Sequence, residues 1–177
     1  MSRGLLESER LSGNHAALQR ELVDLAALAH EVVGEVLDRQ PELPGERPEI
    51  CLHIDPSLIP QTLDPNRIRL LVRNLLDNAL RHSAGAAQPT ELHLRPAAVQ
   101  GGGVEIEVRD YGPGVPDDQL PHLAQAFYRP ESARTRATGG VGLGLYLCKL
   151  VAQAHRGTFA VRNARPGLAV LVTLPGS

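Results

Sequence analysis

The sequence of 177 residues contains no tryptophan, and only five of its residues are phenylalanine or tyrosine. Proteins that bind single-stranded nucleic acid stack the bases on aromatic side chains, so this scarcity argues against such a surface. The formal net charge at pH 7 is −2, which leaves no excess of basic residues to neutralise a phosphate backbone. The composition therefore predicts a protein without a nucleic-acid partner.

Cysteine and long apolar runs are equally scarce. The two cysteines, Cys51 and Cys148, lie in separate apolar stretches without the spacing of metal ligands. They are predicted to be reduced thiols in the core of a protein from a reducing compartment. No apolar run reaches the length of about 18 residues that a membrane-spanning helix needs. The hydrophobic fraction of 42% is ordinary for a single domain with a real core.

The periodicity of the apolar residues predicts the main elements. Helices are expected at residues 22–37, 65–82, 117–123 and from 144 onward, and strands at residues 50–54, 90–96 and 104–110. Asp24 is a candidate N-cap of the first helix, and Asp64 is one for the second, with Pro65 at its first position. The strands at 90–96 and 104–110 are joined by a glycine-rich turn and predict an antiparallel hairpin.

The second predicted helix carries a pair of asparagines beside its apolar face. Asn74 and Asn78 are four residues apart and share one stripe, which Arg81 and His82 continue. Asparagine is a mediocre helix residue because its amide competes for backbone hydrogen bonds. Two interpretations stay open: a polar helix flank, or amide oxygens that face a phosphate or a divalent metal such as magnesium, for which they are suitable ligands.

The strand at 104–110 ends in a carboxylate. Asp110 is followed by Gly112 and Gly114 in the stretch DYGPG. An aspartate before a turn is common, but a carboxylate at the end of an apolar strand is partly removed from water and needs a hydrogen-bond donor. The exocyclic amine of an adenine would be such a donor.

Four glycines stand within residues 139–144, immediately before the last predicted helix. A glycine loop that leads into a helix offers unpaired N–H groups and the positive end of the helix dipole to an anion. The loop is not a P-loop, because no Gly-Lys-Ser/Thr follows, and Leu147 stands where a dinucleotide-binding motif would have its last glycine. The inner side of the helix is predicted to consist of Leu145, Leu147, Leu150, Val151 and Ala154.

The segment before these glycines, YRPESARTRAT, is poor in apolar residues and carries Arg129, Arg134 and Arg136. It is either a plain solvated loop or a lid over a ligand, whose arginines would reach phosphates.

These motifs, in this order, resemble the ATP-binding catalytic domain of bacterial sensor histidine kinases. That domain belongs to a wider ATPase superfamily (GHKL) shared with type II topoisomerases, mismatch-repair ATPases and heat-shock chaperone ATPases. NLLDNALRHS is similar to the N box, DYGPG to the first glycine box, AFYR to the F box and GGVGLGLYLCKL to the second glycine box. The resemblance covers about residues 22–175.

The resemblance implies an α/β (α+β) two-layer sandwich, the Bergerat ATP-binding fold. A mixed, mostly antiparallel sheet of about five strands would be backed by three helices, and its closing strands would be at about residues 158–163 and 168–174. The implied cofactors are ATP and Mg²⁺.

The resemblance also implies roles for individual residues. Asn78, with Asn74, would hold the magnesium ion that bridges the phosphates. Arg81 would help with phosphate, so Asn78 and Arg81 are the implied catalytic residues. His82 would lie beside the nucleotide, and Asp110 would accept a hydrogen bond from the adenine amine.

Further positions follow from the glycine boxes and the lid. Gly112 and Gly114 would shape the adenine pocket, Phe127 would anchor the base of the lid, and Arg134 is the lid arginine assigned to the phosphates. The phosphate loop and lid hinge would comprise Gly140, Val141, Gly142, Leu143, Gly144 and Leu145.

The sequence departs from the family in one respect. The phosphate acceptor of the family is a histidine in a motif like Ser-His-Glu-Leu-Arg-Thr-Pro, and none of the seven histidines has that context; His30 precedes Glu31, but no Arg-Thr-Pro follows. Residues 1–21 are expected to be the C-terminal part of the second dimerisation helix, and residues 22–177 the catalytic domain. The chain should therefore bind Mg-ATP but autophosphorylate little.

The implied partners are the dimerisation and phosphoacceptor domain of a homodimeric parent kinase and a cognate response regulator. The domain would be cytoplasmic, and the parent kinase would be anchored in the inner membrane. Two alternatives stay open: a serine kinase of the anti-sigma-factor type with the same fold, and a non-catalytic switch in which ATP binding orders the lid.

Overall fold

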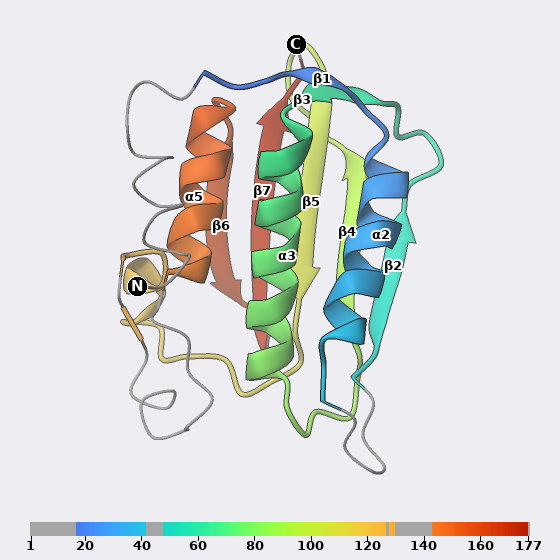
Figure 1. Ribbon diagram of the computed structural model, residues 1–177. Helices are drawn as coiled ribbons and strands as arrows, with labels where there is room; N and C mark the ends of the chain where they lie inside the picture. The colour runs from blue at the N-terminus through green and yellow to red at the C-terminus, as the bar shows by residue number, and fades with distance from the viewer. Residues whose placement is uncertain (1–16, 42–47, 127, 130–142, 177) are drawn as a thin grey trace.

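The computed structural model describes residues 17–41, 48–126, 128–129 and 143–176, and these form two layers (Figure 1). One layer is a five-stranded sheet with the order β2-β4-β5-β7-β6. Its strands are β2 (Ile50–Ile54), β4 (Thr90–Pro96), β5 (Gly103–Arg109), β7 (Leu168–Pro175) and β6 (Thr158–Asn163). The pair β2–β4 is parallel and the other pairs are antiparallel.

The second layer consists of the described helices α2 (Leu25–Asp38), α3 (Pro65–His82) and α5 (Gly144–Ala154), which all cover the same face of the sheet (Figure 1). This arrangement confirms the predicted two-layer sandwich with a mixed sheet. The hairpin of β4 and β5 and the two closing strands are also confirmed.

The cap residues of α2 and α3 lie where the sequence places them. The Asp24 side chain accepts a hydrogen bond from the Ala27 N–H at 3.1 Å, and the Asp64 side chain accepts one from the Arg67 N–H at 3.2 Å. Pro65 stands in the first turn of α3, where its missing N–H costs nothing.

Two local predictions were wrong. The helix expected at residues 22–37 begins only at Leu25, because residues 21–23 form β1 (Glu21–Val23), which pairs antiparallel with β3 (Gln61–Leu63). The cap at Asp24 separates this strand from the helix. The helix expected at residues 117–123 is a single 3-10 turn, η1 (Leu120–His122).

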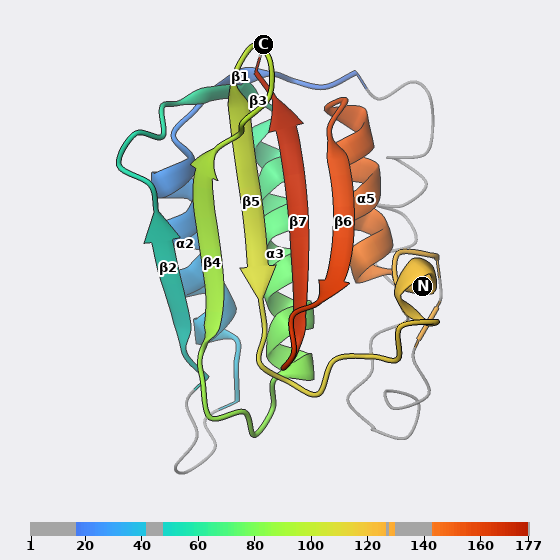
Figure 2. The same cartoon turned by 180° about the vertical axis from the view of Figure 1, so that it is seen from behind.

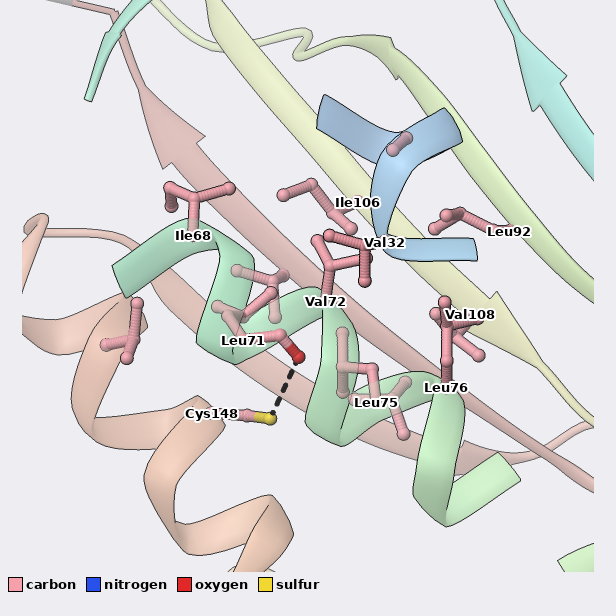
Figure 3. Close-up of a cluster of buried hydrophobic side chains, with 14 of the residues drawn as sticks. Val32, Ile68, Leu71, Val72, Leu75, Leu76, Leu92, Ile106, Val108 and Cys148 are labelled. Carbon is pink, nitrogen blue, oxygen red and sulfur yellow. Dashed lines mark hydrogen bonds between the residues drawn. The ribbon is translucent and has the colours of Figure 1, made fainter. Parts of the chain in front are cut away.

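The core lies between the sheet and α3, the middle helix of its layer (Figure 3). Alternate residues of β4, β5 and β7 point toward the helices, as the pleat of a strand requires. Cys148 of α5 is fully buried, and its thiol donates to the carbonyl oxygen of Leu71 at 3.5 Å. Burial raises the pKa of this thiol, so Cys148 is the reduced core residue that the sequence predicted.

The prediction for Cys51 was wrong. Leu52 and Ile54 pack against the core, so Cys51 and His53 of the same short strand lie on the opposite, helix-free face of the sheet. Cys51 is a half-buried free thiol there.

The inner side of α5 also differs in part from the prediction. Leu145, Leu147 and Val151 are buried as expected, whereas Leu150 and Ala154 are half-buried. Cys148 and Ala152 complete the buried side, because positions three and four residues apart share one helix face.

His155 ties the end of α5 to the start of α3. Its Nδ1–H donates to the carbonyl oxygen of Val151 at 2.9 Å, and its Nε2 accepts from the Asp64 N–H at 3.1 Å. His155 is 1% exposed, and the bond that its Nε2 accepts requires the neutral form of the ring. Among the described residues, no helix combines the length and apolar character of a membrane span.

The neutral state of His155 predicts a pH effect on stability. Burial lowers the pKa of His155 below its ordinary value of 6.5; nearby Arg20 and Arg67 act in the same direction, while Val151 and Asp64 oppose it. The unfolded state takes up this proton more readily than the folded state, so the free energy of unfolding decreases as the pH falls below about 6.5. The full decrease is about 1.4 kcal/mol for each unit by which folding lowers the pKa.

We expect the free energy of unfolding, measured with urea from pH 7 to pH 5, to fall less steeply in His155→Gln than in the wild type. The variant should also be less stable at pH 7, by about 1–3 kcal/mol, because the Asp64 N–H loses the imidazole nitrogen that accepts its hydrogen bond. His122→Gln, at an exposed position of η1, should keep the wild-type slope. Equal slopes for the wild type and His155→Gln would contradict the assignment.

Candidate nucleotide site

The candidate site lies at one end of the sandwich, at the lower edge of Figure 1. There β5 ends, β7 begins, α3 reaches its C-terminal half and α5 starts. The site residues that the structure describes come from these four elements.

Asp110 follows the last residue of β5 and is 2% exposed. Its Oδ1 accepts hydrogen bonds from the Gly112 N–H at 3.0 Å and the Leu168 N–H at 3.3 Å. Burial raises the pKa of Asp110, and these two bonds, together with nearby His82 and Arg109, oppose the rise. Because the two bonds fix Oδ1, Oδ2 is the carboxylate oxygen that can accept from a ligand.

Two glycines allow the backbone to close around this carboxylate. A Cβ on Gly112 would lie 1.9 Å from the carbonyl oxygen of His82, at the end of α3. Gly167 has φ +80°, and a Cβ there would lie 2.0 Å from the carbonyl oxygen of Asp110. Neither position tolerates a side chain without backbone movement, so the packing itself requires glycine.

The segment after Asp110 is held by Asn163 at the end of β6. Its Oδ1 accepts from the Val115 N–H at 3.2 Å, and its Nδ2 donates to the Val115 carbonyl oxygen at 2.7 Å. Gly114 turns the chain here with φ +71°, and a Cβ on it would lie 2.7 Å from the same Asn163 Oδ1. The first glycine box is thereby fixed to the sheet.

The asparagine stripe of α3 faces the start of α5. The Nδ2 of Asn74 donates to the Leu70 carbonyl oxygen at 2.8 Å, so its Oδ1 points away from its own helix. That oxygen lies 3.7 Å from where a Cβ of Gly144 would be. Asn78 lies one turn further along the stripe and is half-buried.

The end of α3 brings the stripe close to the Asp110 end of the site. Arg81 is exposed, and its Nε donates to the Asp77 carbonyl oxygen at 3.4 Å. His82 is half-buried and lies against Gly112 through its backbone carbonyl. Asn74 and His82 are eight residues apart on one helix, which separates them by roughly 12 Å.

The start of α5 has no capping side chain at its N-cap residue, Leu143. The first N–H groups of a helix have no partner within the helix, so they suit an anion. Leu143 and Leu145 are 4% and 6% exposed and pack inward. Any contact of these two residues with a ligand would therefore come from the backbone.

The structure brings together Asn74, Asn78, Arg81, His82, Asp110, Gly112, Gly114, Leu143, Gly144 and Leu145. The remaining predicted site residues, Phe127, Arg134, Gly140, Val141 and Gly142, lie outside the described residues, as does Arg136. Arg129 lies within them and is half-buried.

Sequence analysis missed Leu168, Gly167 and Asn163, which shape the site from the β6–β7 hairpin. The glycine of the RPG turn signalled a tight bend. Nothing in the sequence placed that bend against Asp110, because the two are more than 50 residues apart and meet only when β7 pairs with β5.

The site therefore has two chemically different ends. At one end a buried carboxylate accepts two backbone N–H groups through Oδ1, and its second oxygen suits an amine donor on a planar base. At the other end, amide oxygens and the N-terminus of α5 lie together, which suits a phosphate group with a hard divalent cation. A ligand with a base at one end and phosphates at the other would match both.

Comparisons with known proteins agree with this chemistry. Residues 63–177 match the family model described as histidine kinase-, DNA gyrase B- and HSP90-like ATPase. The chain is 37% identical over 126 residues to the Bacillus subtilis sensor histidine kinase YkoH, covering 71% of this chain and 26% of that protein. It is 36% identical over 162 residues to the Escherichia coli signal transduction histidine-protein kinase BaeS, covering 90% and 32%.

Solved structures show the same relationship. The crystal structure of full-length ShkA in complex with AMPPNP superimposes with a TM-score of 0.79 at 25% identity, over 98% of this chain and 35% of that one. The mycobacterial sensor histidine kinase MprB gives a TM-score of 0.69 at 28% identity, over 88% and 98%.

The chain spans about a quarter to a third of the length of the curated relatives named here. The family model covers more than half of the chain and includes α3, the Asp110 loop and α5. The chain belongs to the family of histidine kinase-, DNA gyrase B- and HSP90-like ATPases, and the proteins it resembles within that family are bacterial sensor histidine kinases.

Proposed function

We propose that this chain is the ATP-binding catalytic domain of a two-component sensor histidine kinase. It would bind Mg-ATP and transfer the γ-phosphoryl group to a histidine on a separate dimerisation domain. The observation that carries this proposal is the buried Asp110 carboxylate, fixed through Oδ1 by two backbone N–H groups and placed between the ends of α3 and β5. The ATP analogue named with the ShkA structure supports the same ligand.

The Asp110 end of the site would distinguish adenine from bases that lack its exocyclic amine. Oδ2 of Asp110 would accept the exocyclic amine, beside the tight turns at Gly112 and Gly114. A base without that amine would leave Oδ2 without this donor in a site removed from water, which is unfavourable. His82 stands next to this pocket through its contact with Gly112.

The phosphate end would position the reacting group. Asn78 and Asn74 offer the oxygens that would hold the magnesium ion, and Arg81 lies one turn further along α3. A bound magnesium ion would neutralise charge on the phosphate oxygens. Phosphoryl transfer needs little covalent chemistry from the protein, so orientation and charge stabilisation by these groups would account for most of the catalysis.

The partners follow from the sensor kinases that the chain resembles. We infer a dimerisation and phosphoacceptor domain within a homodimeric parent kinase, and a cognate response regulator that receives the phosphoryl group. The domain would lie in the cytoplasm, with the parent kinase anchored in the inner membrane. Residues 22–177 would form the catalytic domain, and residues 1–21 the C-terminal part of the second dimerisation helix. Residues 17–20 are irregular and Glu21 already belongs to β1, so these five residues are not part of that helix.

Asp110→Asn should weaken binding of a non-hydrolysable ATP analogue by about 10- to 100-fold. An asparagine amide has only one oxygen. If its NH₂ group points to the ligand, it meets the adenine amine, and if it points to the backbone, it meets the Gly112 and Leu168 N–H groups. In both cases two donors face each other, which is unfavourable. Isothermal titration calorimetry measures the affinity. Asp118→Asn, at an exposed position on the following segment, should bind like the wild type. Unchanged affinity in a folded Asp110→Asn protein would exclude the assigned role.

Asn78→Ala should weaken binding of the ATP analogue only when Mg²⁺ is present. With excess Mg²⁺ we expect a loss of analogue affinity of roughly tenfold, equivalent to about 1.4 kcal/mol, and without Mg²⁺ an affinity equal to that of the wild type. Asn66→Ala, at an exposed position of the same helix, is the matched control. Equal losses with and without Mg²⁺ would instead assign Asn78 to the nucleotide alone.

The kinase activity itself is tested by supplying the missing acceptor. The chain, Mg-ATP and a separately produced dimerisation domain of the parent protein should yield an acid-labile phosphohistidine on that domain, and Asp110→Asn should abolish it. Acid-stable phosphoserine would favour a serine kinase of the anti-sigma-factor type. Analogue binding without any phosphoryl transfer would favour the non-catalytic switch.

A further inference from the structure

A group of metal-binding side chains lies on the face of the sheet that the helices leave open, the near face in Figure 2. His53 of β2 and His93 of β4 are partners in the register of the parallel pair, and Glu91 stands two residues before His93 on the same face. The three potential ligand atoms lie within 4.8 Å of one another.

The side chains are already oriented toward each other. The two imidazole rings stack with centroids 4.5 Å apart and an angle of 14° between their planes. The Nε2 of His93 lies 3.0 Å from Oε2 of Glu91. In a tetrahedral site with bonds of about 2.0–2.1 Å, ligand atoms are roughly 3.3 Å apart. Small rotations about the side-chain bonds would reach that spacing, with no change in the backbone.

We propose that His53, Glu91 and His93 form a binding site for a divalent transition metal, with Zn²⁺ as the ion that fits best. Two imidazoles and one carboxylate are a common zinc ligand set, and a water molecule would fill the fourth position. Imidazole nitrogens distinguish this site from the magnesium position of the nucleotide site, where amide and phosphate oxygens would be the ligands.

The site is accessible from solvent. Glu91 and His93 are half-buried and His53 is exposed, so the metal could enter from solvent.

The site lies on β2 and β4, beside the strand that leads to Asp110. Glu91 of β4 is the register partner of Arg109 at the end of β5, and the Arg109 guanidinium lies 4.5 Å from the centre of the Tyr111 ring. Asp110, between Arg109 and Tyr111, is turned inward and buried. The metal site and the proposed nucleotide site therefore lie on opposite faces of the sheet and share no ligand.

The test is a titration of the full chain with Zn²⁺ in a large excess of Mg²⁺ at pH 7.5, followed by calorimetry and by the thermal midpoint. We expect one saturable site per chain and a higher midpoint with zinc. His53→Ala and His93→Ala should each weaken zinc binding at least about tenfold. His122→Ala, an exposed histidine on η1, should bind zinc like the wild type.

Cys51 is the register partner of Glu91 on the same face, so Cys51→Ser is tested separately. Zinc binding that persists in Cys51→Ser and is lost in both histidine variants would support the proposal. Binding that is lost in Cys51→Ser but unchanged in both histidine variants would overturn it, as would the absence of a saturable site in the wild type. Circular dichroism and binding of the ATP analogue verify that each variant is folded.

Discussion

Six residues on one side of α3 are buried against the sheet and the neighbouring helices, and the stripe of Asn74 and Asn78 runs along the edge of that buried surface. The rotation of α3 about its axis is therefore set by the core, and the same rotation fixes where the two amides point. Because a close-packed core admits few alternative rotations, the amides need no additional support to stay beside α5. Fixed side chains of this kind suit a reaction that depends on position and charge more than on covalent chemistry.

The second constraint is the close approach of three backbone segments around Asp110. The end of α3, the turn at Gly112 and the turn at Gly167 meet with no space for a side chain. The carboxylate is consequently held by the main chain, through the Gly112 and Leu168 N–H groups. These donors are part of the backbone, so the position of the carboxylate is set by the fold.

The local signals in the sequence predicted much of this structure, and the tertiary contacts explain the rest. Caps at Asp24 and Asp64 and the periodicity of α3 depend on neighbours within a few residues, so they were accessible from the sequence. The short strand β1 depends on pairing with β3, about 40 residues away, and had no local signature. The outward position of Cys51 was missed because ICLHI is apolar at most positions, so its pattern did not define a face.

The two faces of the sheet therefore carry different constraints. The inner face must match three helices, whereas the outer face carries ion pairs such as Arg95–Glu105 at 2.6 Å and Arg162–Glu107 at 3.7 Å. Ion pairs of this kind constrain the fold less than the close-packed inner face does. Side chains that bind a metal can therefore accumulate on β2 and β4 without disturbing Asp110, which follows β5 and is buried on the helix side. The sheet separates the proposed metal site from Asp110, and Tyr111, which interacts with Glu91, lies next to Asp110 in the chain.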